Sequence, residues 1–272
     1  MPDPLANKYI ALGVTGSIAC YKAVDLASKL TQAGVLVDVI MTREACQFLA
    51  PLTFQSITHR PVVTDVFDPQ SELSIDHVAI AERADAVIVA PATANTIAKM
   101  AHGYADDALT TTILATQAPL IVAPAMDAHM YDNAATQQNV SILRERGCVI
   151  AGPASGRLAS GLIGKGRLLE TPALLGCLRQ TLGRHGDLEG RRVVVSAGGT
   201  QEPIDPVRVI ANHSSGKMGF ALAEAARDRG ATVSLVSAPT ALPDPFGIKV
   251  VRVQTALQML DALHSDAPMP TH

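Results

Sequence analysis

Short aliphatic runs alternate with helical patterns along the N-terminal part of the chain, and this alternation limits the fold more than any other feature. The runs are rich in Val, Ile, Leu and Ala, as are strands buried on both faces of a sheet. They cover 9–13, 35–41, 86–90, 120–123 and 148–151, and helical patterns lie near 19–33, 44–49, 95–100, 109–116 and 133–146. Strands alternating with helices predict an α/β fold with a doubly wound, Rossmann-like parallel sheet.

The composition indicates a small-molecule protein rather than a nucleic-acid or membrane protein. The 272 residues are 48% hydrophobic, which is enough for one large or two ordinary domains, and the 22 basic and 25 acidic residues nearly balance. No basic run favours nucleic acid or an anionic membrane surface, and no apolar run reaches the roughly 20 residues that span a bilayer. We therefore expect a cytoplasmic protein with neither partner.

Cysteine and histidine usage argues against a metal centre. The four cysteines (Cys20, Cys46, Cys148 and Cys177) lie far apart, and no histidine lies at metal-ligand spacing from them. Structural zinc sites need closely spaced pairs of such residues. We therefore expect reduced thiols and no metal bound by this first region.

The first strand turns directly into a helix through Gly13–Lys22, which reads GVTGSIACYK. Glycine allows backbone N–H groups to approach a ligand closely, and a helix N-terminus favours an anion. The segment lacks both the spacing of a phosphate-binding NTPase loop and a complete GxGxxG pattern. It therefore predicts a phosphate site or, as the alternative, a glycine turn that serves packing alone.

Three further loops follow predicted strands, where ligands of such sheets gather. The first reads APATAN (90–95), the second APAMD (123–127), and the third (152–167) is long and rich in Gly and Ser. Long loops in compact domains often act as lids. These loops therefore predict a ligand site covered by 152–167.

A second region begins after the polar segment 183–190. It contains a strand (192–197), a Gly-Gly-Thr turn, a loop at 212–219, a helix (220–229), another strand (232–237) and a final helix near 255–263. This pattern predicts a second Rossmann-like domain, although it is shorter than the roughly 100–150 residues usual for that architecture. We expect a domain over 1–185 and an incomplete, truncated one over 186–272.

The ordered motifs closely resemble one family, the bifunctional flavoproteins of coenzyme A biosynthesis. The N-terminal motifs read GSIACYK, SIDHVAIAERADAVIVAPATANTIAKMAHGYADD, LTTTILAT, PAMDAHMY and ASGLIGKGR, and the C-terminal motif reads SAGGTQEPIDPVRVIANHSSGKMG. The resemblance implies an FMN-dependent phosphopantothenoylcysteine decarboxylase, of the flavin-containing cysteine decarboxylase family, joined to a phosphopantothenate–cysteine ligase.

For the decarboxylase, the resemblance implies a set of FMN contacts. They are Gly16, Ser17, Ile18 and Ala19 in the phosphate loop, Thr42 after the second strand, and Ala92, Thr93 and Asn95 after the third. Thr93 has an alternative explanation, because Thr is also a good helix N-cap. Oxidation of the cysteine thiol by FMN would let CO2 leave 4′-phosphopantothenoylcysteine, and electrons returned by the flavin would complete 4′-phosphopantetheine.

The resemblance assigns the catalytic base to His77, whose imidazole has a pKa near neutrality. Without the surrounding motif, a surface histidine near a helix start would be the ordinary interpretation. Met126 and Arg167 are the implied substrate contacts, and Arg167 has the alternative of being solvated.

Two positions depart from the commonest family pattern. Asp127 stands where an asparagine is usual, and Ser160 stands where a cysteine is usual. Both remain candidate catalytic residues. A serine hydroxyl is a far weaker acid than a thiol. One hypothesis for Asp127 is that it is protonated and mimics an amide donor.

For the second region, the resemblance implies a ligase that joins 4′-phosphopantothenate to cysteine with CTP and Mg2+. Asn212 is the implied catalytic residue. The nucleotide contacts would be Gly198, Gly199, Thr200, Ser214, Ser215, Gly216, Lys217 and Met218. A dinucleotide site is the alternative, but no acidic residue ends the strand 232–237. The family's later ligase motifs do not occur before His272, which predicts an inactive ligase half.

Other functions remain open from the sequence. A flavin prenyltransferase or a peptidyl-cysteine decarboxylase would share the first domain, and so would a non-catalytic FMN-binding regulatory subunit. The C-terminal motif argues against the first two, and His77 argues against the third. The resemblance further implies a homo-oligomer, from trimer to dodecamer.

Overall fold

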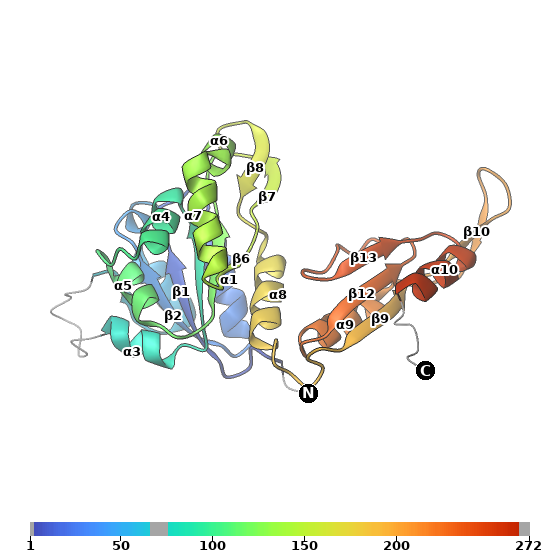
Figure 1. Cartoon of the computed structure of the whole chain (residues 1–272), viewed down its shortest axis with the longest axis horizontal. Coiled ribbons are helices and arrows are strands. Elements are labelled where there is room, and N and C mark those ends of the chain that lie inside the picture. The colour runs from blue at the N-terminus through green and yellow to red at the C-terminus, as the bar shows by residue number, and fades with distance from the viewer. Residues whose placement is uncertain (1–2, 66–75, 267–272) are drawn as a thin grey trace. The chain divides into compact units, whose positions relative to one another are not determined.

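The computed structural model describes residues 3–65 and 76–266, and its chain divides into two compact units. Unit 1 is Met1–Leu178 and unit 2 is Arg179–His272. Each unit is described by itself (Figure 1). The division of activities between 1–185 and 186–272 stays a prediction.

Unit 1 is built on a six-stranded parallel sheet in the order β3-β2-β1-β4-β5-β6. Strand β1 pairs with β2 on one side and with β4 on the other, so the strand order reverses between β1 and β4. The strands are β1 (Tyr9–Val14), β2 (Leu36–Met41), β3 (Val62–Val63), β4 (Ala86–Ala92), β5 (Leu120–Pro124) and β6 (Val149–Ile150). The predicted doubly wound sheet is confirmed.

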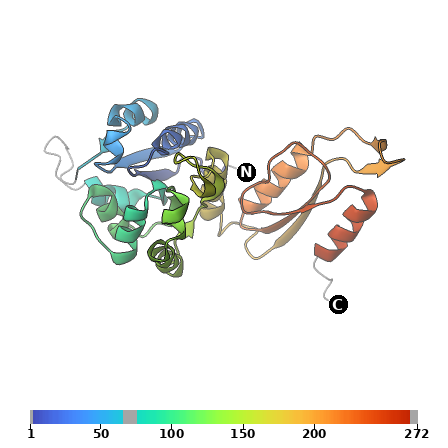
Figure 2. The same ribbon diagram turned by 90° about the horizontal axis from the view of Figure 1, so that it is seen from above.

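Helices cover both faces of this sheet, and Figure 2 shows α1 and α2 on one side with α4 and α5 on the other. The helices are α1 (Cys20–Gln32), α2 (Pro51–Thr58), α3 (Asp76–Arg83), α4 (Ala94–His102), α5 (Ala108–Ala115), α6 (Ala128–Asp132), α7 (Ala134–Glu145) and α8 (Thr171–Leu182). Because helices cover both faces, the central strands lose nearly all contact with water: every residue of β4 is buried.

The core of unit 1 is aliphatic, as the low aromatic content requires. One cluster packs β2, β4 and β5 against α4 and α5, and its members include Ile40, Val87, Val89, Ile97, Leu109 and Val122. Strand β2 also carries a buried carboxylate, Asp38. It accepts hydrogen bonds from Arg60 Nε (2.7 Å) and Arg83 Nε (2.8 Å). Two guanidinium partners compensate for the desolvation of one buried carboxylate.

Two expectations for local structure in unit 1 were wrong. The helix expected at 44–49 is only a short 3-10 turn, η1 (Ala45–Gln47), and the helix α2 begins at Pro51, since proline suits the first helical turn. The segment expected to be a long loop is an antiparallel hairpin of β7 (Ala154–Arg157) and β8 (Ile163–Arg167). We call residues 154–167 the flap.

Unit 2 contains a three-stranded parallel sheet in the order β13-β12-β9. Its elements are β9 (Arg192–Ala197), β10 (Gln201–Pro203), β11 (Val209–Ala211), α9 (Lys217–Arg227), β12 (Thr232–Ser237), β13 (Lys249–Arg252) and α10 (Ala256–Asp266). Phe220, Ala223 and Leu235 lie in its small apolar core. The expected second Rossmann-like unit is confirmed, and β13 and the β10–β11 hairpin are additions to the prediction.

Within residues 3–65 and 76–266, no helix is both long enough and apolar enough to cross a bilayer.

Candidate functional site

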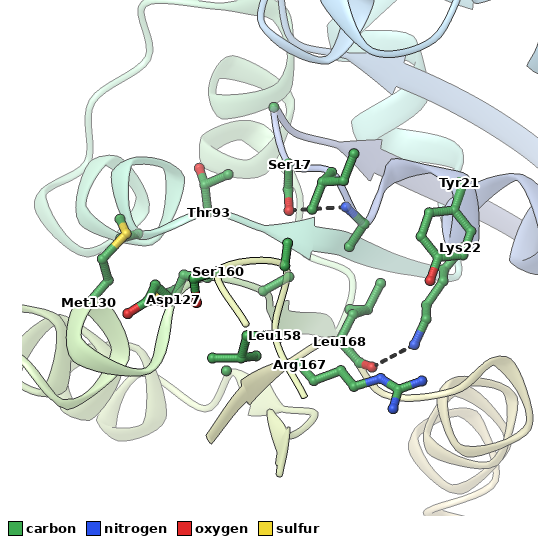
Figure 3. Close-up of a pocket in the computed structure, with 18 of the residues that line it drawn as sticks. Ser17, Tyr21, Lys22, Thr93, Asp127, Met130, Leu158, Ser160, Arg167 and Leu168 are labelled. Carbon is green, nitrogen blue, oxygen red and sulfur yellow. Dashed lines mark hydrogen bonds between the residues drawn. The ribbon is translucent and has the colours of Figure 1, made fainter. Parts of the chain in front are cut away.

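A cavity of about 650 Å³ opens at the carboxyl ends of the central strands of unit 1 (Figure 3). Its walls come from the loop after β1, the loop after β4, the loop after β5 and the flap. This is the place where the strand order reverses, and ligands of doubly wound sheets bind there. The lining residues are Gly16–Ala19, Tyr21, Lys22, Thr93, Ala94, Ala125–Asp127, Met130, Arg157–Ser160 and Gly166–Leu168.

The phosphate loop, Gly16 to Ala19, forms one wall. A Cβ on Gly16 would lie 2.4 Å from Glu44 Cβ, so only glycine lets this loop approach the turn after β2. The N-cap residue of α1, Ala19, makes no side-chain cap hydrogen bond. An anion can take the place of the missing cap at the start of this helix.

Gly13 serves packing rather than a ligand. A Cβ there would lie 2.4 Å from Leu109 Cδ1 on α5, and neither Gly13 nor Gly16 has a positive φ. Close approach, and not left-handed backbone, is therefore what requires glycine at both ends of this turn. The packing explanation of this motif holds for Gly13, while Gly16 borders the cavity.

Thr93 lies at the cavity wall and caps a helix as well. Its Oγ1 accepts a hydrogen bond from Thr96 N (3.3 Å) at the start of α4. Its own N–H donates to Thr15 Oγ1 (3.0 Å), and the buried Thr15 hydroxyl donates to Pro91 O (2.7 Å). Thr15 therefore holds the loop after β4 against the loop after β1, a role that the sequence analysis missed.

Three of the predicted FMN contacts do not line this cavity. Thr42 is buried and its Oγ1 accepts a hydrogen bond from Ala45 N (3.3 Å), the first residue of η1. Ala92 is buried at the end of β4, and Asn95 is exposed on α4. Their roles toward a cofactor stay predictions.

Asp127 and Ser160 meet at the cavity, although 33 positions separate them. Ser160 Oγ, at the tip of the flap, donates to Asp127 Oδ2 (2.6 Å), and the other carboxylate oxygen accepts from His129 N (3.0 Å) at the start of α6. These two donors, Ser160 first, hold the pKa of Asp127 below its ordinary value. These contacts favour the ionised carboxylate, and the protonated form expected from the sequence stays a prediction.

Met126 and Arg167 also border the cavity, as predicted for substrate contacts. Met126 N donates to Gly166 O (2.9 Å), which fastens the flap to the loop after β5. Arg167 Nη2 donates to Glu170 Oε1 (2.7 Å), so this guanidinium is already paired. Figure 3 shows the Arg167 and Lys22 side chains on the same side of the cavity.

His77 belongs to the first turn of α3, but its side chain lies outside the described residues. Its role as catalytic base stays a prediction.

Several cavity residues were not singled out from the sequence. Tyr21 and Lys22 belong to the GSIACYK motif, so their motif could have signalled them. Met130 belongs to the PAMDAHMY motif and could have been signalled likewise. Arg157 and Leu158 lie outside the quoted motifs, and only the hairpin brings them to the cavity.

In unit 2, the predicted nucleotide loops converge at the carboxyl ends of β9 and β12. Gly216 caps α9 with a positive φ of 74°, and a Cβ there would lie 3.5 Å from Gly198 N and 3.4 Å from Thr240 Oγ1. Thr240 Oγ1 donates to Ser215 O (3.0 Å), and a Cβ on Gly199 would lie 2.6 Å from Asn212 O. The predicted residues therefore form one cluster of loops.

Exposure separates the members of that cluster. Gly216 is buried, whereas five other predicted residues are exposed: Asn212, Ser214, Ser215, Lys217 and Met218. Thr200 is half-buried. Among the residues that the structure describes, no three His, Cys, Asp or Glu side chains come together as a metal site would require.

Two protein families match successive parts of the chain. Residues 2–183 match the family described as Flavoprotein, and residues 188–270 match the DNA/pantothenate metabolism flavoprotein C-terminal domain. The chain belongs to the flavoprotein family, and the two matches follow each other in the order that the motifs predicted.

Individual relatives agree with this result. The chain is 47% identical over 263 residues to the coenzyme A biosynthesis bifunctional protein CoaBC of Vibrio vulnificus, a match that covers 97% of this chain and 65% of that protein. The expected resemblance to bifunctional proteins of coenzyme A biosynthesis is confirmed. The chain spans less than two thirds of the length of this relative.

Two solved structures of similar fold are a PPC decarboxylase mutant and an FMN-dependent cysteine decarboxylase. A cysteine-to-serine mutant of PPC decarboxylase complexed with pantothenoylaminoethenethiol has a TM-score of 0.59 and 30% identity, covering 64% of this chain and 97% of that one. The FMN-dependent cysteine decarboxylase SpaF has a TM-score of 0.53 and 35% identity, covering 60% and 91%.

Proposed function

We propose that unit 1 is an FMN-dependent decarboxylase that converts 4′-phosphopantothenoylcysteine to 4′-phosphopantetheine in coenzyme A biosynthesis. One observation carries the proposal: a single cavity brings together the phosphate loop, Thr93, Met126 and the Asp127–Ser160 pair. The similarity to CoaBC proteins and to PPC decarboxylase supports it.

The residues present fit FMN. A volume of about 650 Å³ suits a cofactor-sized ligand, since such sites usually enclose roughly 300–1,000 Å³. The uncapped start of α1 and the tight loop at Gly16 would hold the phosphate, and Thr93 would lie along the rest of the molecule. FMN, when bound, supplies the reversible oxidation that makes loss of CO2 from a cysteine possible.

The chain itself supplies orientation and proton transfer. The Asp127 carboxylate can accept a proton and the Ser160 hydroxyl can pass one, so this pair is the proton-transfer group of the described cavity. His77 is the proposed base for the first step. Arg167 and Met126 would orient the substrate at the flap.

The direct test measures CO2 released from 4′-phosphopantothenoylcysteine by the purified, FMN-loaded chain. The expected result is turnover that is lost in His77→Asn with the flavin spectrum unchanged. Flavin-loaded protein without CO2 release would contradict the decarboxylase and favour a non-catalytic FMN-binding subunit. Release from a peptide with a C-terminal cysteine, but not from the phosphorylated substrate, would favour a peptidyl-cysteine decarboxylase instead.

For unit 2 we propose a CTP site of the phosphopantothenate–cysteine ligase type, with Mg2+ offsetting the triphosphate charge. The observation that favours it is the convergence of the loops at Gly198, Ser215 and Gly216. Calorimetric titration of the chain with CTP and Mg2+ tests the site, and ATP is the matched control ligand. Equal affinity for both nucleotides, or no binding, would contradict it.

We also propose a homo-oligomer of the trimer-to-dodecamer type, located in the cytoplasm. Ile18 and Tyr21 border the cavity and are each 61% exposed, so a neighbouring subunit could cover them near the cofactor. Light scattering on the FMN-loaded chain tests the assembly, and a monomer would contradict it. Cell fractionation tests the location.

A further inference from the structure

Lys22 is a buried cation in the cavity wall that the proposed chemistry does not use. Its side chain is only 8% exposed, although it carries a charge. Burying an ammonium group costs free energy unless close partners compensate for the lost water. The partners of Lys22 therefore indicate what the residue does.

Both partners lie immediately after the second strand of the flap. Lys22 Nζ donates to Leu168 O (3.1 Å) and to Glu170 Oε1 (2.9 Å). Leu168 directly follows the last residue of β8, and it is 1% exposed. Lys22 thus binds the backbone at the base of the flap, as the dashed line in Figure 3 shows.

Glu170 extends this contact to Arg167. The same carboxylate oxygen that accepts from Lys22 also accepts from Arg167 Nη2 (2.7 Å). The hydrogen bond from Lys22 holds the pKa of Glu170 below its ordinary value, so the carboxylate stays ionised between two cations. The carboxylate therefore connects the buried base of the flap with a more exposed cation on its surface.

The other end of this connection is the phosphate loop. Lys22 lies in the first turn of α1, where its N–H donates to Ala19 O (3.0 Å). The tip of the flap is held separately, by the hydrogen bond from Ser160 to Asp127. The flap is therefore tied at its tip to the loop after β5 and at its base to α1.

We propose that Lys22 is a positioning residue that holds the base of the flap against α1, and that it also positions Arg167 through the Glu170 carboxylate. The step to substrate binding rests on the proposed function, because it takes 4′-phosphopantothenoylcysteine as the ligand beneath the flap. Lys22 acts on the flap and not on the reacting atoms. Its loss raises KM while kcat stays near its original value.

Limited trypsin digestion of the FMN-loaded chain measures the flap without any need for turnover. Cleavage after Arg157 and Lys165, followed by mass spectrometry, reports opening of the flap, since proteolysis follows the population of the open form. Lys22→Met keeps the length of the side chain and removes the charge. Lys29→Met is the matched control, because Lys29 is exposed on the same helix and its Nζ donates to Gln32 Oε1 (3.5 Å) on that helix.

The expected result for Lys22→Met is flap cleavage and KM that both rise by about tenfold, with kcat and FMN affinity within about twofold of the original chain. Glu170→Gln leaves the hydrogen bond from Lys22 Nζ to Leu168 O intact, so flap cleavage and KM should rise less than in Lys22→Met. Lys29→Met should behave as the original chain does.

Two outcomes overturn the proposal. The first is a folded Lys22→Met protein whose flap is cleaved at the original rate. If that variant does not fold, Glu170→Gln decides, because Glu170 is 59% exposed and tolerates the change: unchanged cleavage together with unchanged KM overturns the proposal. Failure of CO2 release alone contradicts the decarboxylase, while cleavage still tests the flap.

Discussion

The two units place the same kind of loop, rich in glycine and hydroxyl groups, at the carboxyl ends of parallel strands, but they surround it differently. In unit 1 the flap lies over the loop, and a cavity of about 650 Å³ results. In unit 2 the corresponding residues Asn212, Ser214 and Ser215 are exposed, and the hairpin nearby carries exposed apolar side chains such as Val207 (89%) and Ile210 (66%). A local motif becomes an enclosed site only where a distant segment covers it.

The largest effect should come from breaking the attachment of the flap. A Cβ at Gly166 would lie 2.2 Å from Met126 O, and relieving this clash would require the backbone to shift at a substantial cost in free energy. Gly166→Ala should cost about 3 kcal/mol of stability and lower kcat/KM more than about 100-fold. Thermal unfolding and turnover measure this. Gly156→Ala, also in the flap, is the control, because Gly156 has no positive φ and a Cβ there would lie at an ordinary contact distance of 3.4 Å from Arg167 Cδ. Equal losses in both variants would contradict the role of the contact.

The next effect concerns the Asp127–Ser160 hydrogen bond. Since both side chains act through one bond, Asp127→Asn and Ser160→Ala should each lower kcat/KM by about tenfold, and the double variant by no more than about tenfold, a coupling of about 1.4 kcal/mol. Additive losses in the double variant would show that the two residues act separately.

The same pair has a defined pH dependence. Because the folded-state pKa of Asp127 is lowered, its stabilising bond is fully present above the ordinary pKa of an aspartate and is lost as the pH falls through the lower folded value. Carbon NMR titration of the Asp127 carboxyl group in the full chain measures this directly. We expect a pKa below that of an unfolded aspartate, whereas a raised value would support the protonated form expected from the sequence.

A smaller effect is expected at Thr15, which joins two loops of unit 1. Thr15→Val keeps the shape but removes the hydroxyl that bonds Pro91 O and Thr93 N, at a cost of about 1–2 kcal/mol. FMN affinity, followed by flavin fluorescence, should fall by about tenfold. Thr31→Val on α1 is the control, because it removes a hydroxyl that donates to Ala27 O on its own helix. An unchanged FMN affinity in Thr15→Val would contradict a role of Thr93 in holding the cofactor.

The smallest effect should be confined to unit 2. Gly216→Ala forces a side chain into a positive φ and should cost about 1–2 kcal/mol. CTP affinity should fall, whereas FMN affinity and the flavin spectrum should not change. A change in flavin binding would contradict this expectation and show that the substitution also acts on unit 1.

Much of the architecture could be predicted because its causes are local. The aliphatic runs that became β1, β2, β4 and β5 show their burial in their own composition, and the expected bounds differ from those observed by at most two residues. The flap could not be predicted in this way. Its strands are half-exposed and rich in glycine, so their pairing depends on contacts with α6 and the loop after β5 rather than on their own periodicity.

The sequence by itself determined the parallel sheet, the second Rossmann-like unit and the glycine-rich loop at Gly16, because hydrophobic period and turn chemistry are properties of neighbouring residues. The tertiary structure alone decided which side chains act together. The pairing of Asp127 with Ser160 joins residues 33 positions apart, and that of Lys22 with Glu170 joins residues 148 positions apart. Such contacts form only when crossover helices return the strands to one edge of the sheet, and no local pattern records them.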